Sequence, residues 1–160
     1  LENVMVGQHV RTQATVLDAI FKTQRYREEE QLIKDRAKAW LEYVGLGNYG
    51  HFTAKNLSYG HQRRLEIARA LATQPQLLAL DEPAAGMNAT EKMELRALLE
   101  KIVADGVTIL LIEHDVKLVM GLCDRVTVLD YGKVIACGHP ADIQKDQQVI
   151  EAYLGQGSHS

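Results

Sequence analysis

The chain has 160 residues, of which 46% are hydrophobic and 24% are charged, a composition ordinary for a soluble globular protein. This length is sufficient for a single domain with a substantial hydrophobic core. The 18 Lys and Arg residues and the 21 Asp and Glu residues leave a net charge of −3. Such a balance provides no general electrostatic attraction for nucleic acid or for an anionic membrane.

Segments for export, membrane insertion or cross-linking are not recognisable. The longest aliphatic run, Val107 to Ile112, is far too short to cross a bilayer, and the N-terminal region lacks the apolar stretch of a secretory signal. The two cysteines, Cys123 and Cys137, have neither metal-site spacing nor the density of a disulfide framework. We expect both to be buried free thiols in a reducing compartment.

The first half of the sequence predicts helices. A short helix is expected from Thr15 to Thr23, and apolar residues spaced by three and four predict an amphipathic helix from Glu28 to Val44. The glutamates Glu28 to Glu30 would occupy its first turn, where they suit the helix dipole. After a glycine-bounded loop, a third helix is expected from about Gly60 to Thr73.

The second half alternates strand and helix. Buried strands are expected at Gln76 to Leu80 and at Val107 to Glu113, and Asn88 and Glu91 form a capping-box pattern ahead of a helix that reaches about Ala104. The other predicted elements are a helix capped by Asp115 that runs to Leu122, a hairpin of Arg125 to Leu129 and Lys133 to Ala136 around Tyr131-Gly132, and short helices at Ala141 to Lys145 and Gln147 to Leu154. This order predicts an α/β fold with a parallel sheet and an antiparallel hairpin at or near its edge.

Two segments carry candidate chemistry. The apolar run Leu77 to Leu80 ends in Asp81 and Glu82, so both carboxylates are expected at the carboxyl edge of a sheet, where open α/β folds bind ligands. At the start of the third helix, Ser58 and Gly60 bring a hydroxyl and backbone N–H groups to the positive end of the helix dipole, which favours an anion. Taken alone, the two segments are better explained by a solvated strand end and a plain serine cap.

Taken together, four motifs in register resemble the ATPase domain of ABC transporters. The similar segments are Ser58-Tyr59-Gly60-His61-Gln62 for the signature, Leu80-Asp81-Glu82-Pro83 for the Walker B strand, Ala85-Gly86-Met87-Asn88 for the D-loop, and His114 for the switch histidine. The resemblance runs essentially from Leu1 to Leu154 and is strongest to an ATP-binding subunit of bacterial branched-chain amino-acid importers. It implies part of a P-loop NTPase core of the RecA-like ABC type, with residues 1–74 as the helical subdomain and residues 75–160 as the C-terminal part of the core.

The resemblance also implies a role in Mg²⁺-ATP hydrolysis for each matching residue. Asp81 would support Mg²⁺ through water, Glu82 would polarise or deprotonate the attacking water, and His114 would sense the γ-phosphate. The residues that would contact an ATP held by the opposite subunit of a head-to-tail dimer are Ser58, Tyr59, Gly60, His61 and Gln62, with Asn88 in the D-loop. The reaction would be phosphoryl transfer by positioning and charge stabilisation.

Three residues depart from the common family pattern. Tyr59 and His61 replace a glycine and a glutamine of the signature, and Asn88 replaces the D-loop aspartate. The tyrosine and the asparagine resemble variants of the importer subfamily. A histidine so close to the nucleotide could change its affinity or the pH dependence of binding.

One required motif is not found. A Walker A loop needs Gly-x-x-x-x-Gly-Lys-Ser/Thr, and the single Gly-Lys pair, Gly132-Lys133, lacks the first glycine and the hydroxyl residue. Neither Gln8 nor Gln13 ends an apolar strand, as the glutamine of the family's Mg²⁺ site does. We therefore expect a C-terminal fragment that alone neither binds ATP tightly nor hydrolyses it, and whose open strand edges favour self-association.

The partners implied by the resemblance are a second ATPase subunit and transmembrane permease subunits, with no nucleic acid. The permease would dock on the region from Val16 to Val44, which places the protein in the cytoplasm on the inner face of the cell membrane. Two alternatives stay open, the ATPase of another ABC system such as a lipid transporter and a non-catalytic binding module. Glu82 and His114 argue against the second alternative, whereas the missing Walker A loop argues for it in this chain.

Overall fold

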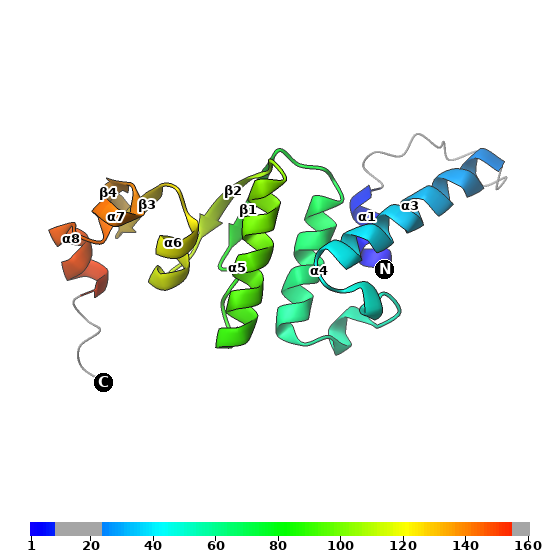
Figure 1. The fold of residues 1–160 in the computed structure, drawn as a ribbon, viewed down its shortest axis with the longest axis horizontal. Helices are drawn as coiled ribbons and strands as arrows, with labels where there is room; N and C mark the ends of the chain where they lie inside the picture. The colour runs from blue at the N-terminus through cyan, green and yellow to red at the C-terminus, as the bar shows by residue number, and fades with distance from the viewer. Residues whose placement is uncertain (9–23, 155–160) are drawn as a thin grey trace. The chain divides into compact units, whose positions relative to one another are not determined.

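The computed structural model describes residues 1–8 and 24–154, and the chain divides into two compact units, residues 1–110 and 111–160 (Figure 1). Among the described residues, the first unit contains four α-helices and the first strand, and the second contains a hairpin with short helices. The second strand crosses the boundary between the units. The sequence motifs predicted a different boundary, between a helical subdomain of residues 1–74 and a core part of residues 75–160. That boundary is defined by motifs and stays a prediction. The helix expected at residues 15–23 lies outside the described residues.

Three helices of the first unit pack around a small apolar core. They are α1 (Glu2–Gln8), α3 (Gln24–Tyr43) and α4 (Tyr59–Leu71), with single 3₁₀ turns η2 (Gly47–Tyr49) and η3 (Ala54–Asn56) in the loop between the last two. Helix α1, which the sequence pattern did not reveal, packs against both α3 and α4. The fit is close at Gly7, where a Cβ would lie 2.3 Å from the carbonyl oxygen of Arg69. The buried apolar residues of these helices include Val4, Ile33, Ala37, Leu41, Ile67 and Leu71.

The two predicted helices in this region are confirmed. Helix α3 begins four residues earlier than expected, so Glu28 to Glu30 lie beyond its first turn, which contains no acidic residue. The expected favourable interaction of these glutamates with the helix dipole is therefore wrong, because the dipole effect is confined to the terminal turn.

A two-stranded parallel sheet follows the helices. Its strands are β1 (Leu77–Asp81) and β2 (Thr108–Ile112), joined by α5 (Ala89–Ala104). Helix α5 buries Leu95, Leu98, Leu99 and Ile102.

The expectation that both strands are buried is wrong in this chain. Burial alternates along each strand, because successive side chains point to opposite faces of a sheet. In β1, Leu78 is buried and Leu77 is 57% exposed, and in β2 the exposed fractions of Leu110 and Ile112 are 54% and 56%. One face of each strand is thus covered by this chain and the other is open.

The second unit is built on an antiparallel hairpin. Strands β3 (Val126–Asp130) and β4 (Lys133–Gly138) pair from Val126 with Gly138 to Asp130 with Lys133. The turn between them has positive φ at Tyr131 (44°) and Gly132 (77°), as type I′ hairpin turns require. The hairpin is confirmed, but it forms its own two-stranded sheet among the described residues, so its expected place at the edge of the parallel sheet is wrong.

Short helices complete this unit. They are α6 (Val116–Leu122), α7 (Pro140–Ile143), α8 (Gln147–Val149) and the single π-helical turn η4 (Ile150–Leu154). Asp115 caps α6 as expected, with its carboxylate accepting the N–H of Leu118 at 3.1 Å. Val126, Ile143 and Val149 form the buried centre of the unit.

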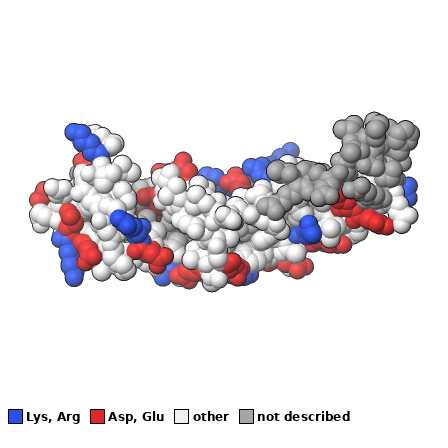
Figure 2. All heavy atoms as spheres, turned by 90° about the horizontal axis from the view of Figure 1, so that it is seen from above, with Lys and Arg blue, Asp and Glu red and all other residues white. Residues whose placement is uncertain are grey.

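The surface carries charges of both signs. In each unit, the face seen in Figure 2 shows acidic and basic side chains interspersed over the described residues, without a large patch of one sign. No helix in the described ranges combines the length and apolar character that a membrane crossing demands.

Both cysteines are free thiols, but Cys123 is only half-buried and Cys137 is exposed, so the expected burial of Cys137 is wrong. Cys137 lies on β4 in a hairpin that forms a sheet of only two strands.

Candidate functional site

The N-terminus of α4 is built around Ser58. The Ser58 side chain accepts the backbone N–H of His61 at 3.3 Å and so caps the helix. The N–H groups of Tyr59 and Gly60 open the helix, and the helix itself contains no carbonyl to accept them. This N-terminus thus combines donors that have no acceptor within the helix with the positive end of the helix dipole, a combination that favours an anion.

The same N-terminus is packed against the start of α5. Asn88 caps α5, and it forms the predicted capping box with Glu91, through Glu91 N to Asn88 Oδ1 at 2.9 Å and Asn88 N to Glu91 Oε2 at 3.1 Å. The Glu91 side chain also lies against Gly60, where a Cβ would come within 2.8 Å of Glu91 Oε1. Glycine at position 60 therefore allows the two helix starts to approach each other.

Two further contacts join the signature and D-loop segments. The ring of Tyr59 lies over Gly86, a residue with a φ of 73°, and a Cβ there would be 3.4 Å from Tyr59 Cε1. One turn along α4, Arg64 forms an ion pair with Glu94 of α5, and the Arg64 side chain is only 13% exposed. The start of α4 and the segment from Gly86 to Glu94 thus pack against each other.

The other signature side chains have local partners. Arg63 donates to the hydroxyl of Tyr59, with an Nη2 to Oη distance of 2.7 Å. The pKa of Arg63 is raised, mainly by its hydrogen bond to Glu66 and to a smaller extent by its hydrogen bond to Tyr59. The ring of His61 packs on Tyr49, with 4.6 Å between centroids. Gln62 Nε2 donates to the carbonyl of Leu57 at 2.9 Å, which holds the loop before the helix.

The two predicted acids stand at the end of β1. Asp81 is the last residue of the strand and Glu82 follows it, and both are exposed. Glu82 has a φ of 43°, in the left-handed region that non-glycine residues rarely adopt. Such strained backbone conformations are concentrated at functional sites, where they direct a side chain away from its regular course. The turn ends in Pro83 and Ala84, which are buried.

His114 belongs to the second unit. It follows β2 and is exposed, and its backbone N–H donates to Glu113 Oε2 at 3.2 Å. Ser58, Gly60 and Asn88 thus lie together in the first unit, whereas His114 is part of the second unit.

The residues present fit a magnesium nucleotide only in part. No group of three His, Cys, Asp or Glu side chains that could hold a metal ion occurs in residues 1–8 and 24–154. Magnesium in nucleotide sites is held by one or two carboxylates together with the phosphates, so a single exposed carboxylate such as Asp81 is a suitable contribution.

Sequence reasoning missed two structural contacts of this region. Glu91 was recognised as a capping residue, but its packing on Gly60 was not expected. Arg64 carried no signal either, since its partner Glu94 is thirty residues away. A basic residue in the second turn of a helix is too common a pattern to predict such a pair.

Comparisons with known proteins place this geometry in a family. A model described as "ABC transporter" matches residues 3–85, and a model described as "Branched-chain amino acid ATP-binding cassette transporter" matches residues 133–159. The chain is 46% identical over 157 residues to the high-affinity branched-chain amino acid transport ATP-binding protein LivG of Salmonella typhimurium, covering 98% of this chain and 62% of LivG. It is 45% identical, with the same coverage, to the corresponding protein BraF of Pseudomonas aeruginosa.

The fold agrees with these matches. A crystal structure of an ATP-binding cassette of an ABC transporter in its ADP conformation superimposes with a TM-score of 0.77 at 29% identity, covering 97% of this chain and 62% of the cassette. The chain thus spans less than two thirds of the length of the relatives that it matches. The family matches agree with the fold, and the chain belongs to the ABC transporter family as part of an ATP-binding domain.

Proposed function

We propose that this chain is part of the ATP-binding subunit of an ABC importer that couples ATP hydrolysis to the uptake of branched-chain amino acids. The observation that carries the proposal is the 46% identity to LivG over 98% of the chain. The match of residues 133–159 to the branched-chain amino acid model supports the same substrate class from a separate segment.

Each site residue has a proposed role that follows from its position. The N–H groups at the start of α4, with Ser58 and Gly60, bind the γ-phosphate of an ATP held by a second subunit, and Tyr59, His61 and Gln62 shape that surface. Asn88 contacts the second subunit through the D-loop. Because the Gly60–Glu91 contact joins these two elements, binding of the phosphate and contact across the dimer would reinforce each other.

The hydrolytic roles fall to the residues that follow the strands. Glu82, directed by its left-handed backbone, orients the attacking water and accepts its proton, and His114 contacts the γ-phosphate. Asp81 would hold Mg²⁺ through water, and the metal would supply charge neutralisation on the phosphates. Transmembrane permease subunits are the proposed partners, which would bring the protein to the inner face of the cell membrane.

A chimera tests this function. The 157 matched residues replace their counterpart in LivG, and the chimera is expressed in a bacterium that lacks its own LivG. We expect leucine uptake to be restored and the purified chimera to hydrolyse ATP. Glu82→Gln should abolish both activities, because the amide cannot accept the proton of the attacking water. Glu100→Gln is the matched control, since Glu100 is exposed on α5 and forms an ion pair with Arg96 of the same helix.

The outcomes separate the alternatives. ATP hydrolysis without leucine uptake would refute the branched-chain substrate and favour another ABC system. Equal ATPase activity in the Glu82→Gln and Glu100→Gln chimeras would refute the role of Glu82. The chain alone is expected to show no saturable binding of Mg²⁺-ATP by calorimetry, and one-to-one binding would refute its proposed dependence on a phosphate loop outside this sequence.

A further inference from the structure

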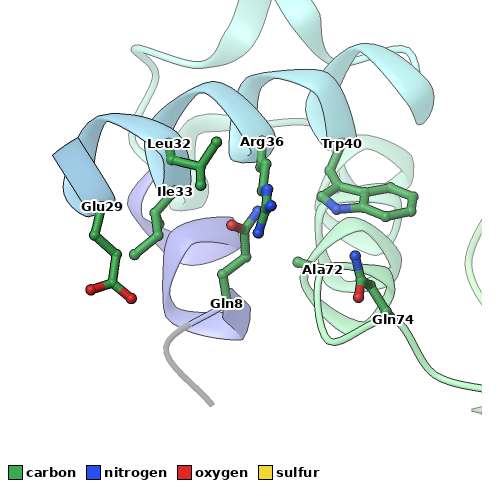
Figure 3. Close-up of a pocket in the computed structure, with 8 residues that line it drawn as sticks. All are labelled: Gln8, Glu29, Leu32, Ile33, Arg36, Trp40, Ala72 and Gln74. Carbon is green, nitrogen blue, oxygen red and sulfur yellow. The ribbon is translucent and has the colours of Figure 1, made fainter. Parts of the chain in front are cut away.

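A cavity of about 60 Å³ lies among the helices of the first unit, away from the signature helix start. Its walls come from the end of α1, one face of α3 and the chain just after α4 (Figure 3). Most of the wall is a stripe of α3 residues at helical spacing, namely Glu29, Leu32, Ile33, Arg36 and Trp40. Gln8, the last residue of α1, enters from the opposite side.

Gln8 is the unusual member of this group. It is 6% exposed, and its amide Nε2 has no hydrogen-bond partner among the residues that the structure describes. A buried donor left unsatisfied destabilises a protein by about 1–3 kcal/mol, so such groups usually have a purpose or an acceptor from outside. In the view of Figure 3, Gln8 reaches from α1 and Arg36 from α3, and the amide and the guanidinium overlap.

The chemistry of the walls defines the acceptor. Gln8 Nε2 offers two hydrogens, and the guanidinium of the exposed Arg36 offers a planar fork that matches the two oxygens of a carboxylate. The side chains of Leu32, Ile33 and Trp40 offer apolar surface beside these donors. Glu29 adds a negative charge on the same helix face, so a ligand with a second anionic group is disfavoured.

We propose that this cavity is a binding site for a small monocarboxylate with a short aliphatic tail. Its carboxylate accepts hydrogen bonds from Gln8 and Arg36, and its tail packs on Leu32, Ile33 and Trp40. The cavity has room for this occupant. A single water needs a cavity volume of only about 10–15 Å³, and this cavity measures about 60 Å³. A carboxylate with one or two carbons fits inside, and the rest of the tail lies along the exposed side chain of Leu32.

The chain provides its own reporter for this site. Trp40 is the single tryptophan of the 160 residues and lines the cavity, so its fluorescence can be followed during titration of the full chain. The probe is isobutyrate, with isobutanol as the neutral analogue and methylmalonate as the analogue with a second carboxylate. We expect saturable binding of isobutyrate with a dissociation constant on the order of 1 mM, and at least about tenfold weaker binding of the other two.

Matched variants connect the signal to the two donors. Arg36→Gln and Gln8→Glu should each weaken isobutyrate binding by about tenfold or more, the first by removing the guanidinium and the second by repelling the ligand. Lys34→Gln removes an exposed cation from the same helix outside the cavity lining and should leave binding unchanged. Far-UV circular dichroism checks that each variant retains its helices.

Several results would overturn the proposal. The site is refuted if isobutyrate gives no saturable change or if isobutanol binds as tightly as isobutyrate. Equal effects of Arg36→Gln and Lys34→Gln would mean that any binding follows net charge and takes place elsewhere. Tight binding of methylmalonate would contradict the role assigned to Glu29.

Discussion

The contact between Gly60 and Glu91 is a sharp test of how the signature helix is held. A Cβ at position 60 would lie 2.8 Å from Glu91 Oε1, 3.0 Å from its Cδ and 3.2 Å from its Cγ. Gly60→Ala must therefore displace the Glu91 side chain. That side chain is not free to move without consequence, because its Oε2 accepts the N–H of Asn88 in the capping box.

The magnitude follows from two opposing effects. Alanine in place of glycine stabilises a helix by about 0.5–1 kcal/mol, and loss of the Asn88 hydrogen bond destabilises by about 0.5–1.5 kcal/mol. In the otherwise unchanged chain, the effect of Gly60→Ala on the unfolding free energy should thus lie between about 0.5 kcal/mol stabilising and about 1 kcal/mol destabilising. In a Glu91→Ala background no side chain opposes the new Cβ, so the same substitution should stabilise by about 0.5–1 kcal/mol.

A double-mutant cycle measures this coupling. Denaturant unfolding of the full chain and its three variants, at a low concentration that limits association, should give a coupling free energy of about 1 kcal/mol. The control cycle pairs Gly60→Ala with Glu100→Ala, since Glu100 lies near the other end of α5. Additivity within about 0.5 kcal/mol in the Glu91 cycle would refute the contact.

Three further predictions concern the rest of the chain. Leu95→Ala should destabilise by about 2–5 kcal/mol because Leu95 is fully buried, whereas Met93→Ala, at a residue 65% exposed on the same helix, should change the unfolding free energy little. Near neutral pH, iodoacetamide should alkylate Cys137 before Cys123. Hydrogen bonds from Thr127 and Arg125 lower the pKa of the exposed Cys137, whereas burial raises the pKa of Cys123. Equal alkylation rates of the two thiols by mass spectrometry would contradict this. In sedimentation velocity the chain should self-associate through the open strand face, and Leu77→Glu should weaken association more than Val103→Glu does; a concentration-independent monomer would contradict this.

The sequence by itself was sufficient for features decided within a few residues. Asn88 and Glu91 stand three positions apart, and their capping box formed as predicted. The same holds for Asp115 at the start of α6 and for the turn at Tyr131-Gly132. Such features need only local backbone geometry, so residue type and spacing determine them. The signature, Walker B and D-loop motifs were recognisable for a related reason, since each is a continuous segment.

Only the tertiary structure decided which of these segments touch. Gly60 and Glu91 are neighbours because α4 and α5 begin side by side, and the pairs Arg64–Glu94 and Tyr43–Asp105 span thirty and sixty-two residues of sequence. The exposure of Leu77 and the unpartnered amide of Gln8 likewise depend on what the folded chain covers and what it leaves open. An apolar run predicts a strand but not how many of its faces find a partner, because burial is a property of the packed neighbours and not of the residue itself.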